Sequence, residues 1–207
     1  MPSASKSRSL LPDALRKQWA RFFLHDVHFA DRHEKLDALY RIRDPWELET
    51  EAQRFRFRET NRLIAEQFGR VGSLLEIGCG EGHQSEHLLQ VCDELVGIDV
   101  SGRAVERARV RCPQATFLEG DVSTAGLDAG ARFDLVVACE VLYYVKDVAA
   151  ELDRLGRLGR GCLVTYYARP AHTLDPHVLA IDGVESTTVQ YGSSSWTIAW
   201  WRRPTED

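Results

Sequence analysis

The sequence predicts an α/β fold, in which helices cover both faces of a mostly parallel β-sheet. From Ser73 onward, short apolar runs alternate with helical stretches, a pattern typical of a parallel sheet. The apolar runs are nearly continuous, as expected for strands that are covered on both sides. Near the C-terminus, two β-rich runs around a Gly-Ser-Ser-Ser turn predict an antiparallel hairpin at the end of this sheet.

The strands and helices of this sheet follow one another without a linker or an internal repeat. Aliphatic runs mark the strands, and mixed charged and apolar residues mark the helices between them. In chain order we expect strand 73–77, helix 84–92, strand 94–99, helix 101–112, strand 115–120, strand 133–139, helix 148–158, strand 161–168 and a hairpin of residues 185–192 and 195–203.

The part of the chain before the first strand is predicted to be helical. Residues 33–42 show a helical pattern that stops before Pro45, because the residue preceding a proline avoids helical dihedral angles. Trp46 opens a longer, charged helix that ends at Gly69. We therefore expect a partly disordered and then helical N-terminal extension (residues 1–35), followed by a single domain (36–207) that has a helical cap (36–70) and an α/β core (71–207).

Composition and charge favour one globular domain that acts on small molecules. The chain has 207 residues, 44% of them hydrophobic and 28% charged, which is enough to bury one core. Its formal net charge of −5 gives no reason to expect a nucleic acid partner, because such binding depends on clustered lysine and arginine. Arg54, Arg56 and Arg58 are a local exception, and a solvent-exposed helix face is the simplest interpretation of them.

The cysteine pattern and the lack of long apolar segments predict a cytoplasmic protein. The five cysteines are odd in number, widely spaced and mostly flanked by aliphatic residues, which predicts reduced, buried thiols and no metal site. The N-terminus has no apolar stretch of signal-peptide length, and nowhere do 18 apolar residues run together. We therefore expect no membrane partner.

The turn after the first predicted strand is rich in glycine and suits a nucleoside cofactor. Glu76, Gly78, Gly80 and Gly82 form an E-x-G-x-G-x-G pattern, and glycines there let the backbone approach a ligand closely. A dinucleotide site would need its third glycine at position 83, which is His83. A sulfonium cofactor has no pyrophosphate, and it needs an acceptor for its ammonium group. Glu76 and the carbonyls of the loop can support that group.

Two further strands end in aspartates that fit the rest of such a cofactor. Asp99, followed by Val100, ends the second strand, and its carboxylate can accept both hydroxyls of a ribose. Asp121 follows the third strand and can bond the amino group of an adenine, while Val122 packs on the ring. Taken alone, each aspartate is equally well explained as a helix cap or a turn residue.

The end of the fourth strand supplies the candidates for the substrate side. Cys139, Glu140, Tyr143 and Tyr144 follow this strand at the point where the order of the sheet should reverse and ligands collect. Packing in an aromatic core is the alternative interpretation of the two tyrosines. We expect this strand end to face the second substrate.

Together, these motifs resemble the class I methyltransferases, which use S-adenosylmethionine, over about residues 73–165. The segments LLEIGCGEG, VGIDVS, FLEGDV and FDLVVACEVLYYV occur in the order and at the spacing of those enzymes. More narrowly, the chain resembles the NodS family in the DPW element that begins at Asp44, in the arginine-bearing helix after it and in the EVLYY signature of residues 140–144. The narrower resemblance extends to most of residues 36–203.

The resemblance implies a Rossmann-like fold with a seven-stranded sheet and S-adenosylmethionine as the cofactor. NodS proteins methylate the amino group of a deacetylated sugar in a chitooligosaccharide. The resemblance therefore implies an N-methyltransferase whose acceptor is an amine-bearing small molecule or glycan. It also implies that Cys139, Trp46 and Arg58 contact the cofactor. Trp46, Tyr143 and Tyr144 would contact the acceptor.

Methyl transfer needs little covalent chemistry from the protein, which must align the nucleophile about 3 Å from the methyl group and exclude water. An amine must be neutral to attack, so we expect Glu140 and Tyr144 to position it and to help remove a proton. Two alternatives share every cofactor motif: a small-molecule O-methyltransferase and a non-catalytic protein that binds S-adenosylmethionine. A methyltransferase of nucleic acids is disfavoured by the acidic charge and by the lack of a proline-aromatic exit from the fourth strand.

Overall fold

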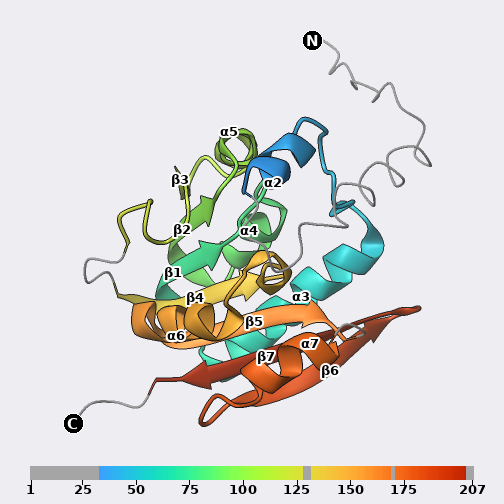
Figure 1. Ribbon diagram of the computed structural model, residues 1–207, viewed down its shortest axis with the longest axis vertical. Coiled ribbons are helices and arrows are strands. Elements are labelled where there is room, and N and C mark those ends of the chain that lie inside the picture. The colour runs from blue at the N-terminus through green and yellow to red at the C-terminus, as the bar shows by residue number, and fades with distance from the viewer. Residues whose placement is uncertain (1–32, 128–131, 169–170, 204–207) are drawn as a thin grey trace.

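The computed structural model describes residues 33–127, 132–168 and 171–203, which form one twisted sheet covered by helices (Figure 1). The strands are β1 Val71–Ile77, β2 Cys92–Asp99, β3 Thr116–Glu119, β4 Phe133–Cys139, β5 Gly159–Tyr167, β6 Glu185–Tyr191 and β7 Ser194–Arg202. They are hydrogen-bonded in the order β3-β2-β1-β4-β5-β7-β6. Strands β1 to β5 are parallel, and β7 is antiparallel to both β5 and β6. The predicted α/β class with an antiparallel C-terminal hairpin is confirmed.

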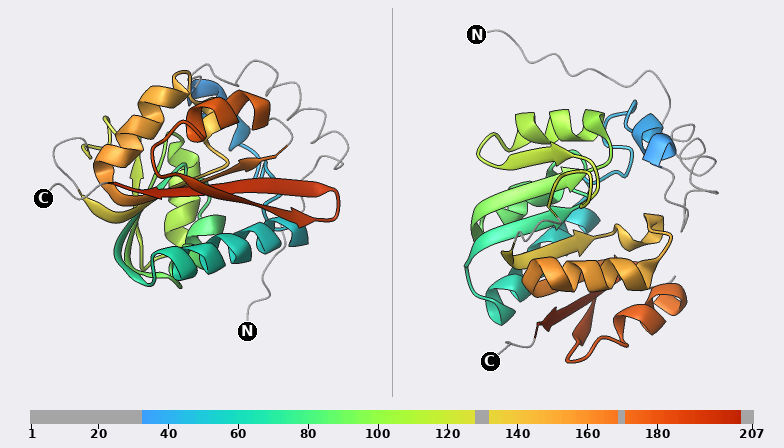
Figure 2. Two further views of the ribbon diagram at one scale, coloured as in Figure 1. Left: turned by 90° about the horizontal axis from the view of Figure 1, so that it is seen from below. Right: turned by 60° about the vertical axis from the view of Figure 1, so that its left-hand side comes forward.

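Helices cover the sheet on both sides, as expected from strands that are apolar throughout (Figure 2). One face carries α3 (Glu51–Gln67), α4 (His83–Leu88) and α5 (Gly102–Arg111), and the other carries α6 (Val148–Leu158) and α7 (Ala171–Val178). Successive residues of a strand point to opposite faces, so Leu74 and Leu75 belong to different apolar clusters although both are completely buried. Each face of the sheet therefore has its own core.

The predicted helix over residues 33–42 is shorter in the structure. Helix α2 spans His33–Leu39 and lies beside α5 (Figure 1). The main-chain oxygens of Tyr40 and Ile42 turn away from the helix and accept hydrogen bonds from Arg107, at 2.7 and 3.2 Å. The contact with α5 ends the helix before the proline does. Most of the expected N-terminal extension lies outside the described residues.

The predicted helix from Trp46 also starts later, at Glu51. Asp44 has a positive φ of 45°, and its carboxylate accepts hydrogen bonds from the N–H groups of Leu48 and Glu49, at 2.7 and 3.3 Å. An aspartate that caps the following backbone N–H groups stabilises a turn. Residues 44–50 therefore form a turn region, and the helix begins after it.

Helix α7 has no counterpart among the predicted elements. Pro176 lies inside it, and a proline argues against a helix because it lacks the N–H donor. In a helix that begins at Ala171, the missing donor affects only the bond to the carbonyl of residue 172. Leu174 and Val178 are fully buried, so packing outweighs this loss.

The hairpin at the end of the chain is built as predicted, with a tighter turn. Tyr191 pairs with Ser194, so only Gly192 and Ser193 lie between the strands. Gly192 has a φ of 59°, which a two-residue hairpin turn requires at this position.

The cysteines agree with the prediction of reduced thiols. All five are free, and Cys139 is the one that is only partly buried. Among the described residues, no helix combines the length and the apolar character that crossing a membrane would require.

Gly97→Ala is expected to destabilise the fold and Gly156→Ala to stabilise it. A Cβ atom at Gly97 would lie 2.6 Å from the ring of Phe117 and 3.0 Å from the Cβ atom of Cys79. Strand β2 would have to shift, at a cost of about 1–3 kcal/mol. At Gly156, inside α6, a Cβ atom would lie 3.8 Å from the Nε1 of Trp201, an ordinary contact, and alanine favours a helix by roughly 0.5–1 kcal/mol. Urea unfolding measures both changes, and equal stability of the variants and the parent would contradict this packing.

Candidate functional site

A cavity of about 780 Å³ lies over the carboxyl ends of β1, β2 and β4. The sheet order reverses here, because the chain runs from β1 outward to β3 and then returns to β4 on the other side of β1. The structure brings most of the predicted site residues together at this place. Those that line the cavity are Trp46, Glu76, Gly78, Cys79, Gly80, Asp99, Val100, Asp121, Val122, Cys139, Glu140, Tyr143 and Tyr144.

The glycine-rich turn presents bare backbone to the cavity. The N–H groups of Gly78 and Cys79 both donate to the carbonyl oxygen of Ile98, at 2.8 and 2.9 Å, which ties the turn to β2. Gly80 has a positive φ of 53°, and a Cβ atom there would lie 2.9 Å from the hydroxyl of Tyr40. A side chain at this position would therefore be both strained and in the way.

Gly82 is not part of the cavity lining, although the sequence predicted a cofactor contact. It has a φ of 79° and precedes the first residue of α4. A Cβ atom there would lie 3.1 Å from the Cα atom of Ala108 in α5. This glycine lets the turn pack closely against the neighbouring helix.

Asp99 ends β2, and two main-chain donors hold its carboxylate. Oδ2 accepts a hydrogen bond from the N–H of Gly80 and Oδ1 from the N–H of Ser101, both at 2.9 Å. Burial raises the pKa of Asp99 to about 6, although these two hydrogen bonds lower it. Each oxygen uses one of its two acceptor positions, so the carboxylate can still accept two hydroxyl donors from the cavity.

Asp121 combines a turn role with a place in the cavity wall. Its Oδ1 accepts hydrogen bonds from both the N–H and the hydroxyl of Thr124, at 2.8 Å each. Partial burial raises the pKa of Asp121, but the hydrogen bonds from Thr124 outweigh it, and the pKa lies below its ordinary value. The buried Val122 forms an apolar wall of the cavity beside Asp121.

Glu76 is a buried carboxyl group near the end of β1, and 2% of its surface is exposed. The hydroxyl of Ser85 donates a hydrogen bond to its Oε2. Burial raises the pKa of Glu76 to about 8, although the bond from Ser85 and the positive charge of Arg56 lower it. At neutral pH this group therefore holds a proton until a cation enters the cavity.

Arg56 brings a guanidinium group into the cavity wall. It is 2% exposed, which corrects the predicted solvent-exposed face at this position. Its Nε donates to the Oε1 of Gln53 at 2.8 Å, and its Nη1 donates to the Oε1 of Gln84 at 3.0 Å. Nη1 also lies 3.4 Å from the Oγ1 of Thr165 on β5. Because these three partners are neutral, they do not neutralise the positive charge of Arg56, which acts on the other groups of the cavity.

Arg58 does not line the cavity, so the predicted cofactor contact does not fit this residue. Its side chain is 54% exposed and forms an ion pair with Glu51 at 3.0 Å. Residues two positions apart on a helix lie about 200° apart around its axis, so Arg56 and Arg58 point in nearly opposite directions. The sequence showed Arg54, Arg56 and Arg58 on this helix but not which of them faces inward.

Glu140 follows β4 and is held in a strained backbone conformation. Its φ is 59°, which is uncommon for a residue with a side chain and is often found at functional sites. Its Oε1 accepts a hydrogen bond from the hydroxyl of Thr165 at 2.9 Å, and its Oε2 accepts one from the hydroxyl of Tyr143 at 3.2 Å. Burial raises the pKa of Glu140, while the charge of Arg56 and these hydrogen bonds lower it.

Three aromatic rings form the wall next to Glu140. The ring centroids of Trp46 and Tyr144 are 5.6 Å apart, and Tyr143 meets Tyr144 edge-on at 6.2 Å. Tyr143 is mostly buried, and its hydroxyl accepts a hydrogen bond from the N–H of Tyr167, so it also belongs to the core. Burial and the charge of Glu140 raise the pKa of both tyrosines, so their hydroxyl groups stay protonated at neutral pH.

The two cysteines of the cavity are small, uncharged wall residues. Burial raises the pKa of Cys139 to about 12 and also raises that of Cys79, so both remain thiols at neutral pH. A thiol in this state behaves as a small apolar side chain.

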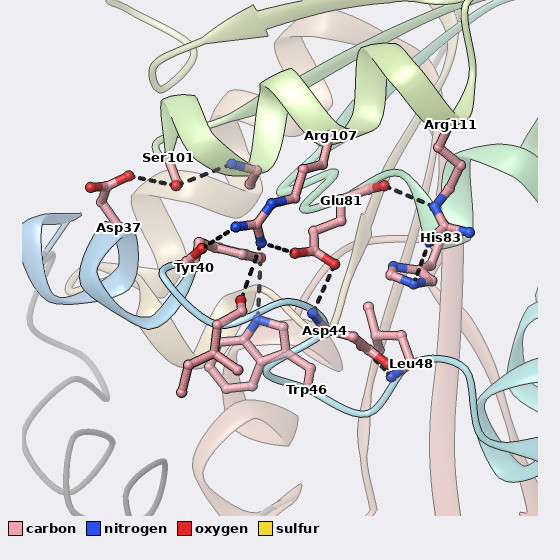
Figure 3. Close-up of polar contacts among 12 residues, drawn as sticks. Asp37, Tyr40, Asp44, Trp46, Leu48, Glu81, His83, Ser101, Arg107 and Arg111 are labelled. Carbon is pink, nitrogen blue, oxygen red and sulfur yellow. Dashed lines mark hydrogen bonds and ion pairs between the residues drawn. The ribbon is translucent and has the colours of Figure 1, made fainter. Parts of the chain in front are cut away.

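The cap is fastened to the core by a network around Arg107 (Figure 3). This side chain of α5 donates to the carbonyl oxygens of Tyr40 and Ile42 and also binds the carboxylate of Glu81. Glu81 in turn accepts a hydrogen bond from the N–H of Asp44 at 2.9 Å. The glycine-rich turn, α5 and the cap therefore hold one another in place.

The same network sets the position of Trp46 over the cavity. Its Nε1 donates to the hydroxyl of Tyr40 at 3.1 Å (Figure 3). The side chains of Leu36 and Leu39, both in α2, form a small apolar cluster, against which Trp46 and Tyr144 pack.

Several uncharged polar residues of the cavity were missed by the sequence analysis. They carry no motif, because glutamine and threonine are common on any surface. A polar residue in the apolar run GCLVTYYA was the one available signal, and it marks Thr165, which is fully buried. The missed residues that line the cavity or contact Glu140 are Tyr40, Gln53, Gln84 and Thr165.

Comparison with known proteins relates this chain to one family of methyltransferases. The family model described as Nodulation protein S (NodS) matches residues 29–158. A Nodulation protein S from Bradyrhizobium diazoefficiens is 33% identical, over 57% of this chain and 57% of that protein. One from Rhizobium tropici is 31% identical, over 69% of this chain and 62% of that protein. A ubiquinone biosynthesis O-methyltransferase from Azorhizobium caulinodans is 32% identical, over 54% of this chain and 46% of that protein. The chain thus spans less than two thirds of the length of these relatives.

Solved structures share the fold over most of the chain. The crystal structure of the N-methyltransferase NodS from Bradyrhizobium japonicum in complex with S-adenosyl-L-homocysteine matches with a TM-score of 0.72 and 25% identity, covering 85% of this chain and 100% of that one. Magnesium protoporphyrin IX methyltransferase from Synechocystis with bound SAM matches with a TM-score of 0.62 and 15% identity, covering 95% of this chain and 100% of that one. The predicted Rossmann-like class I methyltransferase fold is confirmed.

Glu76→Gln is expected to change how stability depends on pH. Burial raises the pKa of Glu76 to about 8, so the folded chain keeps a proton that the unfolded chain releases above its ordinary pKa of 4.5. The proton retained by Glu76 favours the folded state at low pH. Its contribution to the free energy of unfolding is lost as the pH rises through about 8. Glutamine has no such proton, so the variant should lose less stability between pH 6 and 8, by on the order of 2–3 kcal/mol.

Urea unfolding at the two pH values measures this difference. Glu86→Gln is the matched control, because it makes the same change in a side chain of α4 that is 60% exposed. Parallel pH curves for the parent and Glu76→Gln would contradict the raised pKa.

Proposed function

Because the chain belongs to the NodS family, we propose that it transfers a methyl group from S-adenosylmethionine to an amine nitrogen of a small molecule or glycan. One observation carries this proposal: the buried carboxylate of Asp99 lies at the glycine-rich turn, in a cavity that also holds Arg56 and Glu76. One part of the cavity thus suits a ribose, and another suits the two charges of an amino acid. The NodS structure with bound S-adenosyl-L-homocysteine supports the same cofactor.

The residues of the cavity fit each part of this cofactor. Two hydroxyl groups can reach the free acceptor positions of one carboxylate, and the bare backbone of the glycine-rich turn leaves room for the chain that links nucleoside and amino acid. A buried acid and a buried guanidinium complement an ammonium and a carboxylate group. In this assignment, Asp99 binds the ribose, Asp121 and Val122 the adenine, Glu76 the ammonium group and Arg56 the carboxylate.

When bound, S-adenosylmethionine supplies the methyl group on its sulfonium sulfur. Glu140 accepts the proton of the acceptor amine on its carboxylate, which Thr165 and Tyr143 hold in place. The hydroxyl of Tyr144, which is protonated at neutral pH, donates a hydrogen bond that orients the acceptor. The ring of Trp46 covers the cavity, excludes water and favours a positively charged product.

An O-methyltransferase is the second candidate, because relatives named ubiquinone biosynthesis O-methyltransferase match half of the chain. A carboxylate such as Glu140 can take a proton from a hydroxyl group as well as from an amine. The amine is favoured because a carboxylate beside aromatic rings attracts a cation, which a phenol or alcohol does not offer. Methyl transfer from labelled cofactor to matched amine and hydroxyl acceptors distinguishes the two.

Asp99→Ala is expected to weaken binding of S-adenosyl-L-homocysteine at least tenfold, since the ribose loses its acceptor and the glycine-rich turn loses a contact. Isothermal titration calorimetry measures the affinity. Asp93→Ala is the control, because the Asp93 side chain is 63% exposed near the other end of the same strand. If the parent chain binds neither S-adenosylmethionine nor its demethylated form, the proposed function is wrong.

Glu140→Gln and Tyr144→Phe are each expected to lower the turnover of an amine acceptor, roughly 100-fold for the loss of a general base. The affinity for S-adenosyl-L-homocysteine should stay within about twofold, because neither group is assigned to the cofactor. Turnover is measured with labelled cofactor, and affinity by calorimetry. Glu185→Gln and Tyr191→Phe, both at exposed positions of β6, are the matched controls. Unchanged turnover in both site variants would remove these residues from the mechanism.

A further inference from the structure

Gln84 is a polar side chain of the cavity wall that has no role in the assignment above. It lies in the first turn of α4, is 5% exposed, and lines the cavity together with Arg56. Its Oε1 accepts a hydrogen bond from Nη1 of Arg56 at 3.0 Å. Its Nε2 is buried and has no hydrogen-bond partner among the described residues.

The arginine determines which way this amide faces. A guanidinium group only donates hydrogen bonds, so the amide oxygen of Gln84 must face Arg56. The opposite orientation would bring two donors together. The amide nitrogen must therefore point away from Arg56. The contact with Arg56 thus explains why the amide cannot turn to give Nε2 a partner there.

The missing partner must be an acceptor that enters the cavity. Native proteins pair almost all of their buried polar groups, because an unpaired donor has lost its water without a replacement. The guanidinium of Arg56, which donates to the oxygen of the same amide, is buried beside it, and its hydrogen-bond partners Gln53, Gln84 and Thr165 are neutral. An anion with two oxygens, such as a carboxylate, can accept a hydrogen bond from this N–H and pair with the guanidinium at the same time.

Glu76 supplies the opposite charge nearby. Its carboxyl group is buried in the same cavity, and the positive charge of Arg56 acts on its pKa, which burial raises to about 8. A ligand with an ammonium and a carboxylate group can pair with both residues at once. This arrangement is complementary to the α-amino acid end of a cofactor and not to a simple amine.

We propose that the Nε2 of Gln84 binds the α-carboxylate of the cofactor together with Arg56, and that this pair selects cofactors that keep the carboxylate. The inference rests on the proposed function, from which it takes the identity of the cofactor. A decarboxylated cofactor would leave Gln84 and Arg56 buried without an anion, while its ammonium group could still reach Glu76. Gln84 is thus a residue that determines cofactor specificity.

Calorimetric titration with two probes tests the proposal. The first is S-adenosyl-L-homocysteine, and the second is S-adenosyl-3-thiopropylamine, the same molecule without the carboxylate. The parent chain should bind the first probe at least tenfold more tightly. Gln84→Glu keeps an oxygen for Arg56, removes the amide donor and adds a negative charge. This variant should bind the first probe at least tenfold more weakly than the parent does and the second probe equally or more tightly.

Controls separate a specific effect from damage to the fold. Gln90→Glu makes the same change at an exposed position after α4 and should bind both probes as the parent does. Gln84→Met removes the donor without adding charge, and it gives a second measurement if Gln84→Glu does not fold. Its loss of affinity should again be confined to the first probe.

The possible outcomes are distinct. The role of Gln84 would be overturned if Gln84→Met, and Gln84→Glu where it folds, lost affinity equally for both probes. It would also be overturned if these variants lost affinity for neither probe. A parent chain that binds both probes equally well would overturn the selectivity. A parent chain that binds neither probe would instead overturn the proposed function.

Discussion

The carboxylate of Asp99 is the constraint on which the site depends, because it joins separate segments of the chain. Its oxygens accept hydrogen bonds from the turn after β1, through Gly80, and from the start of α5, through Ser101. The hydroxyl of Ser101 donates to the carboxylate of Asp37 in α2, at 2.7 Å. The glycine-rich turn, the second strand, the helix after it and the cap are therefore positioned around one buried acid.

Burial of acids gives the cavity its chemical character. Glu76, Asp99 and Glu140 all have raised pKa values, and burial is the largest cause for each of them. The charged form of each group is stabilised when a cation arrives, and Arg56 offsets only part of the negative charge.

The order of strands along the chain and the acidic residues of the cavity wall could be predicted from the sequence because both depend on local patterns. Apolar runs followed by Glu76, Asp99 or Asp121 place these residues at the same edge of a parallel sheet, whatever the details of packing. The inward direction of Arg56 could not be predicted, since it depends on how α3 is rotated against the sheet. Helix α7 could not be predicted either, because burial of Leu174 and Val178 outweighs the effect of Pro176 only in the folded chain.

The contacts of Gln84 and Thr165 could not be predicted for a different reason. Each depends on a contact between distant parts of the chain, such as the one between Thr165 and Glu140. A sequence pattern records which residues are neighbours in the chain, and it carries no signal for these contacts. The family resemblance pointed to Arg58, whereas the arginine of this helix that lines the cavity is Arg56.

The way in which the cap is attached has a consequence for how ligands exchange. Helix α3 packs in the main core, whereas the part of the cap before it, residues 36–50, has only the small apolar cluster of Leu36 and Leu39 and is attached by the polar contacts around Arg107 and Glu81. Directional contacts of this kind can break and reform while the two apolar cores of the sheet stay intact. We therefore expect local opening of the cap to be the route by which a nucleoside enters and leaves, and the rate of that opening to limit how fast product can be released.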